Sequence, residues 1–232
     1  MADQLSRRTV IGAAGAAALA ARGEASQTAS GPAAKAIKII GVSCSPRKDR
    51  TTAAAVRVCL EAAKASAPGV EVEFIDLGGL KINGEVAAGI PLPAGERDDF
   101  PQIEAKLRSP EVAGIIVGSP VYFSNMSALC KAFLERWMAY RPTFALRNKV
   151  GGAIAVGAAR NGGQELTLQA IHAAMLCQDM IIVSEGRPTA RLGGILVSAK
   201  DNISSDATGL ATAQSLGRRV AEVAAALRAG GM

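Results

Sequence analysis

Aromatic residues are scarce in this chain. Phe, Trp and Tyr together make up 3% of the 232 residues, whereas hydrophobic residues make up 49% and charged residues 20%. This composition can bury a large core and is not that of a disordered chain. With so few rings available, the many alanine and glycine residues favour close packing of helices on a sheet.

Cysteine and histidine are also few. Cys44, Cys59, Cys130 and Cys177 include no CxxC pair, and His172 is the only histidine. A zinc site or a four-cysteine iron–sulfur cluster requires closer spacing of ligands, so the sequence predicts no bound metal. We interpret most of the cysteines as small buried hydrophobic residues, and a disulfide stays open as the alternative.

The positive charge is modest and scattered. The formal net charge is +6 at pH 7, without a long basic run and without aromatics alternating with basic residues. We therefore predict no nucleic-acid binding. A positive balance of this size is equally suited to a small anionic ligand.

The first 35 residues have a different composition from the rest. Arg7 and Arg8 precede a weakly apolar stretch at 10–21, which is shorter than the roughly 20 residues that a membrane-spanning helix needs. Small residues follow. This order is typical of a twin-arginine export signal, so we predict a signal and linker at 1–35, a periplasmic or otherwise exported protein, and no stable membrane span. The alternative is a disordered basic tail.

Residues 36–232 alternate between strand and helix patterns. Five of each predict an α/β fold with a doubly wound parallel sheet of five strands and helices on both faces. Such sheets bind ligands at the carboxyl ends of their strands, so the loops after the first, third and fourth strands are the candidate site. The expected strands are 37–43, 70–76, 113–119, 149–158 and 180–185. The expected helices are 51–67, 98–107, 127–140, 165–177 and 208–228. The segment 186–206 is expected to be a connection without regular structure.

The first of these loops, 43–52, is rich in hydroxyl groups. It lies between a strand and a helix start, where backbone amides and the helix dipole attract anions. It contains neither GxxxxGK[ST] nor GxGxxG, which favours a terminal monophosphate, as in FMN, over a nucleoside triphosphate or a dinucleotide. The alternative is a capped surface turn. The side chains predicted to bind phosphate oxygens are Ser43, Ser45, Arg47, Thr51 and Thr52.

The second loop, 118–125, carries two adjacent aromatics. Gly118 and Pro120 predict a tight turn, while Tyr122 and Phe123 offer flat apolar surface for a tricyclic ring. Aromatics at this place could equally belong to the core.

The third loop, 157–165, begins at Gly157. The consecutive Gly162 and Gly163 allow the backbone to approach a planar ligand closely. Arg160 and Asn161 could meet the pyrimidine carbonyls of a flavin, where a positive charge would stabilise the reduced anion. The alternative is a plain turn.

The three segments SCSPRKDRTT, GSPVYFSNMSALCKAFLERW and RNGGQE together resemble the NADPH-dependent FMN reductases. The iron–sulfur flavoproteins and the tryptophan-repressor-binding-protein type of quinone reductase are closer still. The resemblance covers residues 37–185 and implies a flavodoxin-like fold, noncovalent FMN and a homodimer or homotetramer. It assigns Ser45, Arg47, Thr51 and Thr52 to the phosphate, Pro120, Val121, Tyr122, Phe123 and Ser124 to the ring and ribityl chain, and Arg160, Asn161, Gly162 and Gly163 to the far side of the ring.

Two departures from this family are visible. The segment 78–99, where the iron–sulfur branch has a compact cysteine cluster, contains no cysteine, so we predict no cluster here. Cys44 stands where many relatives have glycine, and Thr51 where many have asparagine.

The resemblance implies an FMN-dependent oxidoreductase. Electrons would pass from a small-molecule donor, NAD(P)H in the family, to a quinone or similar small acceptor. Because the protein then supplies orientation and electrostatics, we expect no catalytic acid, base or triad. Two alternatives remain, a one-electron carrier without a small substrate and a flavin-free binding domain.

Overall fold

The computed structural model describes residues 36–231, so the predicted signal and linker at 1–35 lie outside the described residues. The strands are β1 (Ile37–Ser43), β2 (Val70–Asp76), β3 (Val112–Tyr122), β4 (Asn125–Met126), β5 (Val150–Gly157), β6 (Ile181–Ile182) and β7 (Gly194–Val197). They form a sheet in the order β2-β1-β3-β5, with β6 and β7 both pairing with β5. All pairs are parallel except that of β4 with β3.

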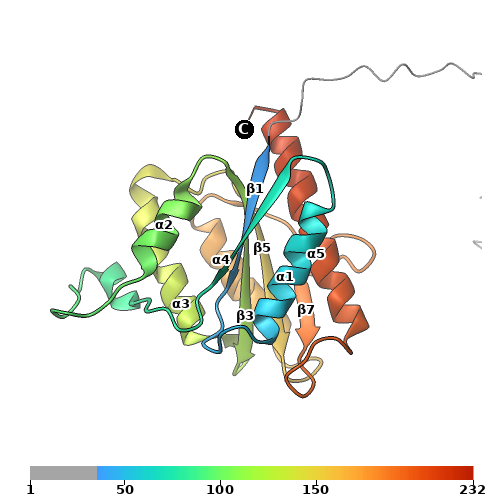
Figure 1. Cartoon of the computed structure of the whole chain (residues 1–232), viewed down its shortest axis with the longest axis horizontal. Coiled ribbons are helices and arrows are strands. Elements are labelled where there is room, and N and C mark those ends of the chain that lie inside the picture. Colours follow the sequence, from blue (N-terminus) through green and yellow to red (C-terminus); the bar gives the residue numbers. More distant parts are fainter. Residues whose placement is uncertain (1–35, 232) are drawn as a thin grey trace, which may run out of the picture. The chain divides into compact units, whose positions relative to one another are not determined.

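Helices cover both faces of this sheet. The α-helices are α1 (Thr51–Lys64), α2 (Phe100–Arg108), α3 (Ala128–Glu135), α4 (Gln164–Leu176) and α5 (Ala207–Ala229), and the 3-10 segments are η1 (Gly84–Ala88) and η2 (Arg136–Thr143). Figure 1 shows α1 and α5 side by side on one face and α2 and α3 on the other. No helix among residues 36–231 combines the length and apolar character that crossing a membrane requires.

The core is divided by the sheet into two layers of side chains. Ile37 and Ile39 of β1 contribute to the layer under α1 and α5, while Ile40 and Val42 contribute to the layer under α2, α3 and α4. Both faces of β1 are therefore buried, which explains its continuous apolar sequence. The predicted α/β architecture, a parallel sheet between two helical layers, is confirmed.

The fifth strand position was only partly predicted. Of the expected strand at 180–185, only β6 pairs with β5, and the edge is continued by β7, which lies in the segment expected to be a connection. The chain turns away after β6 and passes Gly186, whose φ is +73°. The β7 sequence GILV is only four residues long, which is too short to give a clear strand pattern.

The helix expected at 127–140 is also shorter than predicted. The α-helical part ends at Glu135, and η2 continues the turns to Thr143. Pro142 lacks an amide hydrogen and its ring would clash with an α-helical carbonyl one turn earlier, so a regular α-helix cannot continue through it.

Candidate functional site

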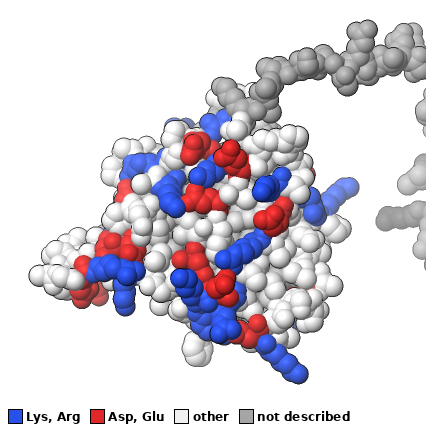
Figure 2. All heavy atoms as spheres, viewed as in Figure 1, with Lys and Arg blue, Asp and Glu red and all other residues white. Residues whose placement is uncertain are grey.

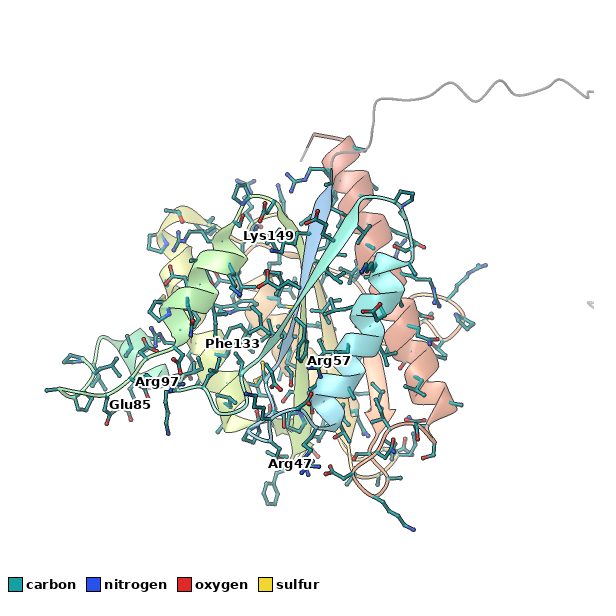
Figure 3. All side chains as sticks on the ribbon, in the orientation of Figure 1. Arg47, Arg57, Glu85, Arg97, Phe133 and Lys149 are labelled. Carbon is teal, nitrogen blue, oxygen red and sulfur yellow. The ribbon has the colours of Figure 1, made fainter. Side chains whose placement is uncertain are left out.

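The three predicted loops leave the sheet at one edge. Ser43, the last residue of β1, is directly opposite Gly118 of β3, and Pro120 of β3 is opposite Val156 near the end of β5. Figure 3 shows Arg47 of the first loop at this edge, with Lys149 near the opposite end of the sheet. The parallel topology therefore brings together segments that are about 40 to 120 residues apart in the chain.

The first loop leads into a helix that lacks a capping side chain. Arg50 occupies the N-cap position of α1 without accepting a hydrogen bond, and the first turn contains no acidic residue. The backbone amides of the first turn have no intrahelical acceptor. Thr51 and Thr52 are both buried in this turn. An anion placed before Thr51 would supply the missing acceptor and interact favourably with the helix dipole.

A buried hydroxyl without a partner lies beneath this helix start. Ser43 Oγ is fully buried and makes no hydrogen bond among the described residues. Its neighbour across the register, Gly118, is so close to α1 that a Cβ there would lie 2.5 Å from Val56 Cγ2 and 3.4 Å from Thr52 Cγ2. Since paired residues of parallel strands point to the same face, the Ser43 side chain also faces the first turns of α1. Ser45, also buried, accepts a hydrogen bond from the Arg47 amide at 3.2 Å.

Basic side chains surround the same loop. Asp201, in the loop after β7, lies 2.9 Å from Arg47 and 3.5 Å from Arg50, so a single carboxylate serves two guanidinium groups. Lys48 and Lys200 are exposed and form no ion pair among the described residues. Figure 2 shows Lys and Arg crowded with a few acids toward the lower edge of the molecule, the edge at which Figure 3 labels Arg47. The excess positive charge favours an anionic ligand here.

The second loop is a β-hairpin rather than the predicted turn at Gly118 and Pro120. Strand β3 stays paired with β5 as far as Pro120, and its last residues, Val121 and Tyr122, pair with β4. Phe123 and Ser124 form the two-residue connection to β4. Their φ angles are +50° and +60°, values that such hairpins usually assign to Asn and Gly. Tyr122 is half-exposed and Phe123 is completely exposed, at 105%. Phe123 therefore does not belong to the core.

The third loop is in direct contact with the tip of this hairpin. Gly163 has φ +100°, and a Cβ on it would lie 2.5 Å from the Cα of Ser124. The buried Gln164 holds the loop in shape, because its Nε2 donates to the Ala159 carbonyl at 2.7 Å and its Oε1 accepts from the Gly162 amide at 2.8 Å. Gly157 is required at the end of β5, since a Cβ there would lie 2.5 Å from Gln164 Nε2.

Arg160 does not extend freely toward a ring site. Its guanidinium forms an ion pair with Asp206 and donates to the Ile195 carbonyl at 3.4 Å. Asp206 also accepts from the amides of Val197 and Gly209, which caps α5. The positive charge expected at the pyrimidine end of a flavin is thus balanced by a carboxylate, and the geometry gives Arg160 a role in fixing the loop after β7. Asn161, by contrast, is exposed with φ +58° at the loop tip.

Ser127 connects the first loop to the second. Its hydroxyl donates to the Cys44 carbonyl at 2.7 Å and accepts from the Cys130 amide at 3.1 Å, while its own amide donates to Ser119 Oγ at 3.0 Å. Burial, followed by hydrogen bonding to the Cys130 thiol, raises the pKa of the Cys44 thiol well above its usual value. Ser127 stands at the start of the helix expected at 127–140, and its contact with Cys44, 83 residues away, was not visible in the sequence.

These observations fit FMN. The uncapped start of α1, the orphan Ser43 hydroxyl and the basic rim suit a dianionic phosphate, and the touching second and third loops offer aromatic and glycine-lined surface for a planar ring. Of the predicted site residues, Arg160 is engaged elsewhere, in its ion pair with Asp206. The others lie in the three loops at this edge of the sheet: Ser43, Ser45, Arg47, Thr51, Thr52, Pro120, Val121, Tyr122, Phe123, Ser124, Gly157, Asn161, Gly162 and Gly163. Sequence analysis missed Gln164, Asp201 and Asp206, although Gln164 stands within the RNGGQE segment.

Known proteins resemble this chain over most of its length. Residues 37–191 match the family model of the NADPH-dependent FMN reductases. An iron–sulfur flavoprotein of Methanocaldococcus jannaschii is 44% identical over 81% of this chain and 97% of its own. An NAD(P)H dehydrogenase (quinone) of Paracoccus denitrificans is 35% identical over 50% of this chain and 63% of its own. The crystal structure of a flavodoxin, WrbA-like protein of Agrobacterium tumefaciens has a TM-score of 0.57 and 19% identity, and covers 82% of this chain and 98% of that one.

The archaeal relative overturns the export prediction. The alignment covers 97% of that protein, which leaves it almost no sequence that could correspond to a leader of the predicted length. The Arg7–Arg8 pair and the small residues after it are thus a compositional pattern without support from the relatives. We withdraw the prediction of a twin-arginine signal and a periplasmic location.

The comparisons show the family of the chain. No group of three or more His, Cys, Asp or Glu residues that could hold a metal ion occurs in the described part of the chain. The three loops of this chain lie at one edge of the sheet and fit FMN. The chain is a flavodoxin-like, FMN-binding oxidoreductase and belongs to the NADPH-dependent FMN reductase family.

Proposed function

We propose that the protein takes electrons from NAD(P)H and passes them to a quinone or another planar aromatic acceptor. The observation that carries the proposal is Phe123, a fully exposed aromatic held at a fixed place beside the ring loops. FMN supplies the two-electron chemistry when it is bound, and the protein supplies binding and orientation. Support for the donor comes from the family description and from the Paracoccus relative, whose name includes both NAD(P)H and quinone.

The position of Phe123 is unfavourable for folding alone. An L-residue at φ +50° costs about 1 kcal/mol, and the exposed ring recovers nothing by burial within the described chain. The hairpin is nevertheless held firmly, because Ser124 packs on Gly163 and β4 pairs with β3. A rigid aromatic of this kind can stack on a planar ligand at little entropic cost.

The test uses the FMN-loaded protein and two acceptors. Stopped-flow reduction by NADPH is expected to be saturable, and steady-state turnover is expected with a soluble naphthoquinone and with ferricyanide. In Phe123→Ala, the KM for the naphthoquinone should rise about tenfold, since a lost aromatic stack costs on the order of 1.5 kcal/mol. The KM for ferricyanide, which has no flat apolar face, should stay unchanged.

Phe144→Ala is the matched control. Phe144 also has a left-handed φ, +49°, and an exposed ring, but it follows η2 and is not part of the three loops. Its replacement should change neither KM. If NADPH does not reduce the loaded protein, the reductase proposal fails and the electron-carrier alternative gains support; if Phe123→Ala behaves like Phe144→Ala, the stacking role fails.

A self-association of the chain is also proposed, as a homodimer or homotetramer. Cavities of about 620 and 510 Å³ run along α3 and α4 and share Leu134, Glu135 and Ala174. Near them Met138, Leu166 and Leu176 are each more than half exposed. An apolar surface of this kind supports an interface between copies.

Light scattering after gel filtration tests the assembly. We expect wild type to elute above the monomer mass and Leu166→Glu to elute as a monomer, because a carboxylate would be buried in the contact. Ala211→Glu, which adds the same charge at an exposed residue of α5 on the other face of the sheet, should assemble like wild type. A monomeric wild type would refute the proposal.

A further inference from the structure

Two of the buried cysteines lie at the base of the phosphate loop. Cys44 is the first residue after β1, and Cys130 is in the first turn of α3. Both side chains are completely buried and belong to the same core layer. Cys59 is equally buried but lies in α1, in the opposite layer, and Cys177 is exposed.

One hydroxyl group fixes the backbones of this pair. Ser127 Oγ is 2.7 Å from the Cys44 carbonyl and 3.1 Å from the Cys130 amide, so both residues are hydrogen-bonded to the same atom. The Cys44 amide is tied to the Gly118 carbonyl at 2.8 Å. Burial, and after it the Cys130 side chain, raises the pKa of the Cys44 thiol. The shared Ser127 hydroxyl and the shared core layer place Cys44 and Cys130 next to each other.

We propose that Cys44 and Cys130 form a reversible disulfide that ties the phosphate loop to α3, and that bound FMN prevents its formation. The oxidant is a hydroperoxide. One thiol takes an oxygen atom from it to give a sulfenic acid and water, and the second thiol displaces a second water as the S–S bond forms. The two thiols and one molecule of hydrogen peroxide together give one disulfide and two molecules of water. A dithiol reductant converts the disulfide back to the two thiols.

FMN protects the pair through the loop. Arg47 and Arg50 share the single carboxylate of Asp201, and Lys48 between them in the sequence forms no ion pair among the described residues. Without a phosphate, the positive charge that Asp201 leaves unbalanced favours opening of the loop at Cys44. With a phosphate bound the loop stays closed and both thiols stay buried, out of reach of the peroxide.

The effect must be reciprocal. A disulfide would link Cys44 covalently to α3 and so restrain the backbone at Cys44 and at the adjacent Ser45 of the phosphate loop. If the disulfide weakens FMN binding by some factor, FMN disfavours the disulfide by the same factor. We expect this factor to be at least tenfold, measured as the ratio of FMN dissociation constants.

The experiment compares full-length apoprotein and FMN-loaded protein exposed to hydrogen peroxide. After alkylation with N-ethylmaleimide, non-reducing peptide mapping should find the Cys44 and Cys130 peptides joined and lighter by two hydrogen atoms. The joined species should form at least tenfold faster in the apoprotein, while Cys177 is modified at equal rates in both. FMN fluorescence titration should then show at least tenfold weaker binding to the oxidised apoprotein, reversed by dithiothreitol.

Two variants separate the pair from other thiols. Cys59→Ala should behave like wild type, whereas Cys130→Ala should keep its FMN affinity after peroxide treatment. The proposal is overturned if the joined peptide is missing from apoprotein whose Cys177 is fully modified, or if it forms equally fast with FMN bound. It is also overturned if oxidised Cys130→Ala loses FMN as wild type does. Mapping of the wild type decides these points even if a variant folds poorly.

Discussion

Replacement of Arg50 with aspartate is expected to stabilise the apoprotein and to weaken FMN binding about 100-fold. Arg50 is the N-cap residue of α1 and provides no cap at present. Aspartate there can accept from the first-turn amides, which is worth about 1 kcal/mol in the free energy of unfolding. The same carboxylate takes the place of a phosphate oxygen and repels the phosphate, while one attractive charge is lost; each effect is worth roughly 1.4 kcal/mol.

Arg50→Asn separates the two contributions. Asparagine caps a helix about as well as aspartate but carries no charge, so this variant should gain similar stability and lose only about tenfold in FMN affinity. Urea unfolding of the apoprotein and fluorescence titration with FMN measure both quantities. If Arg50→Asp bound FMN as tightly as wild type, the phosphate would not lie at the start of α1.

The position of the first loop at the ligand-binding edge of the sheet could be predicted from the sequence because its signal is local. Ser45, Thr51 and Thr52 stand within ten residues of one another between a strand and a helix, and the strand–helix alternation alone places that loop at the ligand-binding edge. The second and third loops were found in the same way. Their positions follow from topology, which the periodicity of the chain already determines.

The features that were missed depend on contacts between distant segments. Asp206 and Arg160 pair across 46 residues, and nothing near Arg160 in the sequence indicates that its charge is balanced. The hairpin at Phe123 and Ser124 contradicts the usual preference for Asn and Gly at left-handed positions, so local turn rules predict it poorly. Strand β7 depends on two distant segments. It pairs with β5, and its Ile195 amide donates a hydrogen bond to the Thr212 hydroxyl of α5 at 3.0 Å.

These missed features surround the three predicted loops and do not change where the loops lie. Asp201 and Asp206 both belong to the loop after β7, and both hold arginines of the predicted loops. The positive charge around the site is therefore partly balanced before any ligand binds. These ion pairs reduce the repulsion among the basic side chains in the apoprotein. The start of α1 is then the main source of attraction for the phosphate.

Replacement of Gly163 with alanine is expected to have the largest effect of any single methyl group at the site. The new Cβ would lie 2.5 Å from Ser124 Cα, and φ +100° is unfavourable for any L-residue. The strain and the forced separation of the two loops should together lower the free energy of unfolding by about 3 kcal/mol. Because the ring surface is made by both loops, FMN affinity should fall at least tenfold, measured by fluorescence titration.

Gly89→Ala is the control for the cost of placing an L-residue at a left-handed φ. Gly89 has φ +80° and no atom within 4 Å of the position its Cβ would take, and it ends η1 rather than a site loop. Alanine there should cost about 1 kcal/mol in urea unfolding and leave the FMN dissociation constant unchanged. The difference between the two variants then measures the contact of Gly163 with Ser124. Equal losses of stability, with wild-type FMN affinity in Gly163→Ala, would mean that the second and third loops bind the flavin independently of each other.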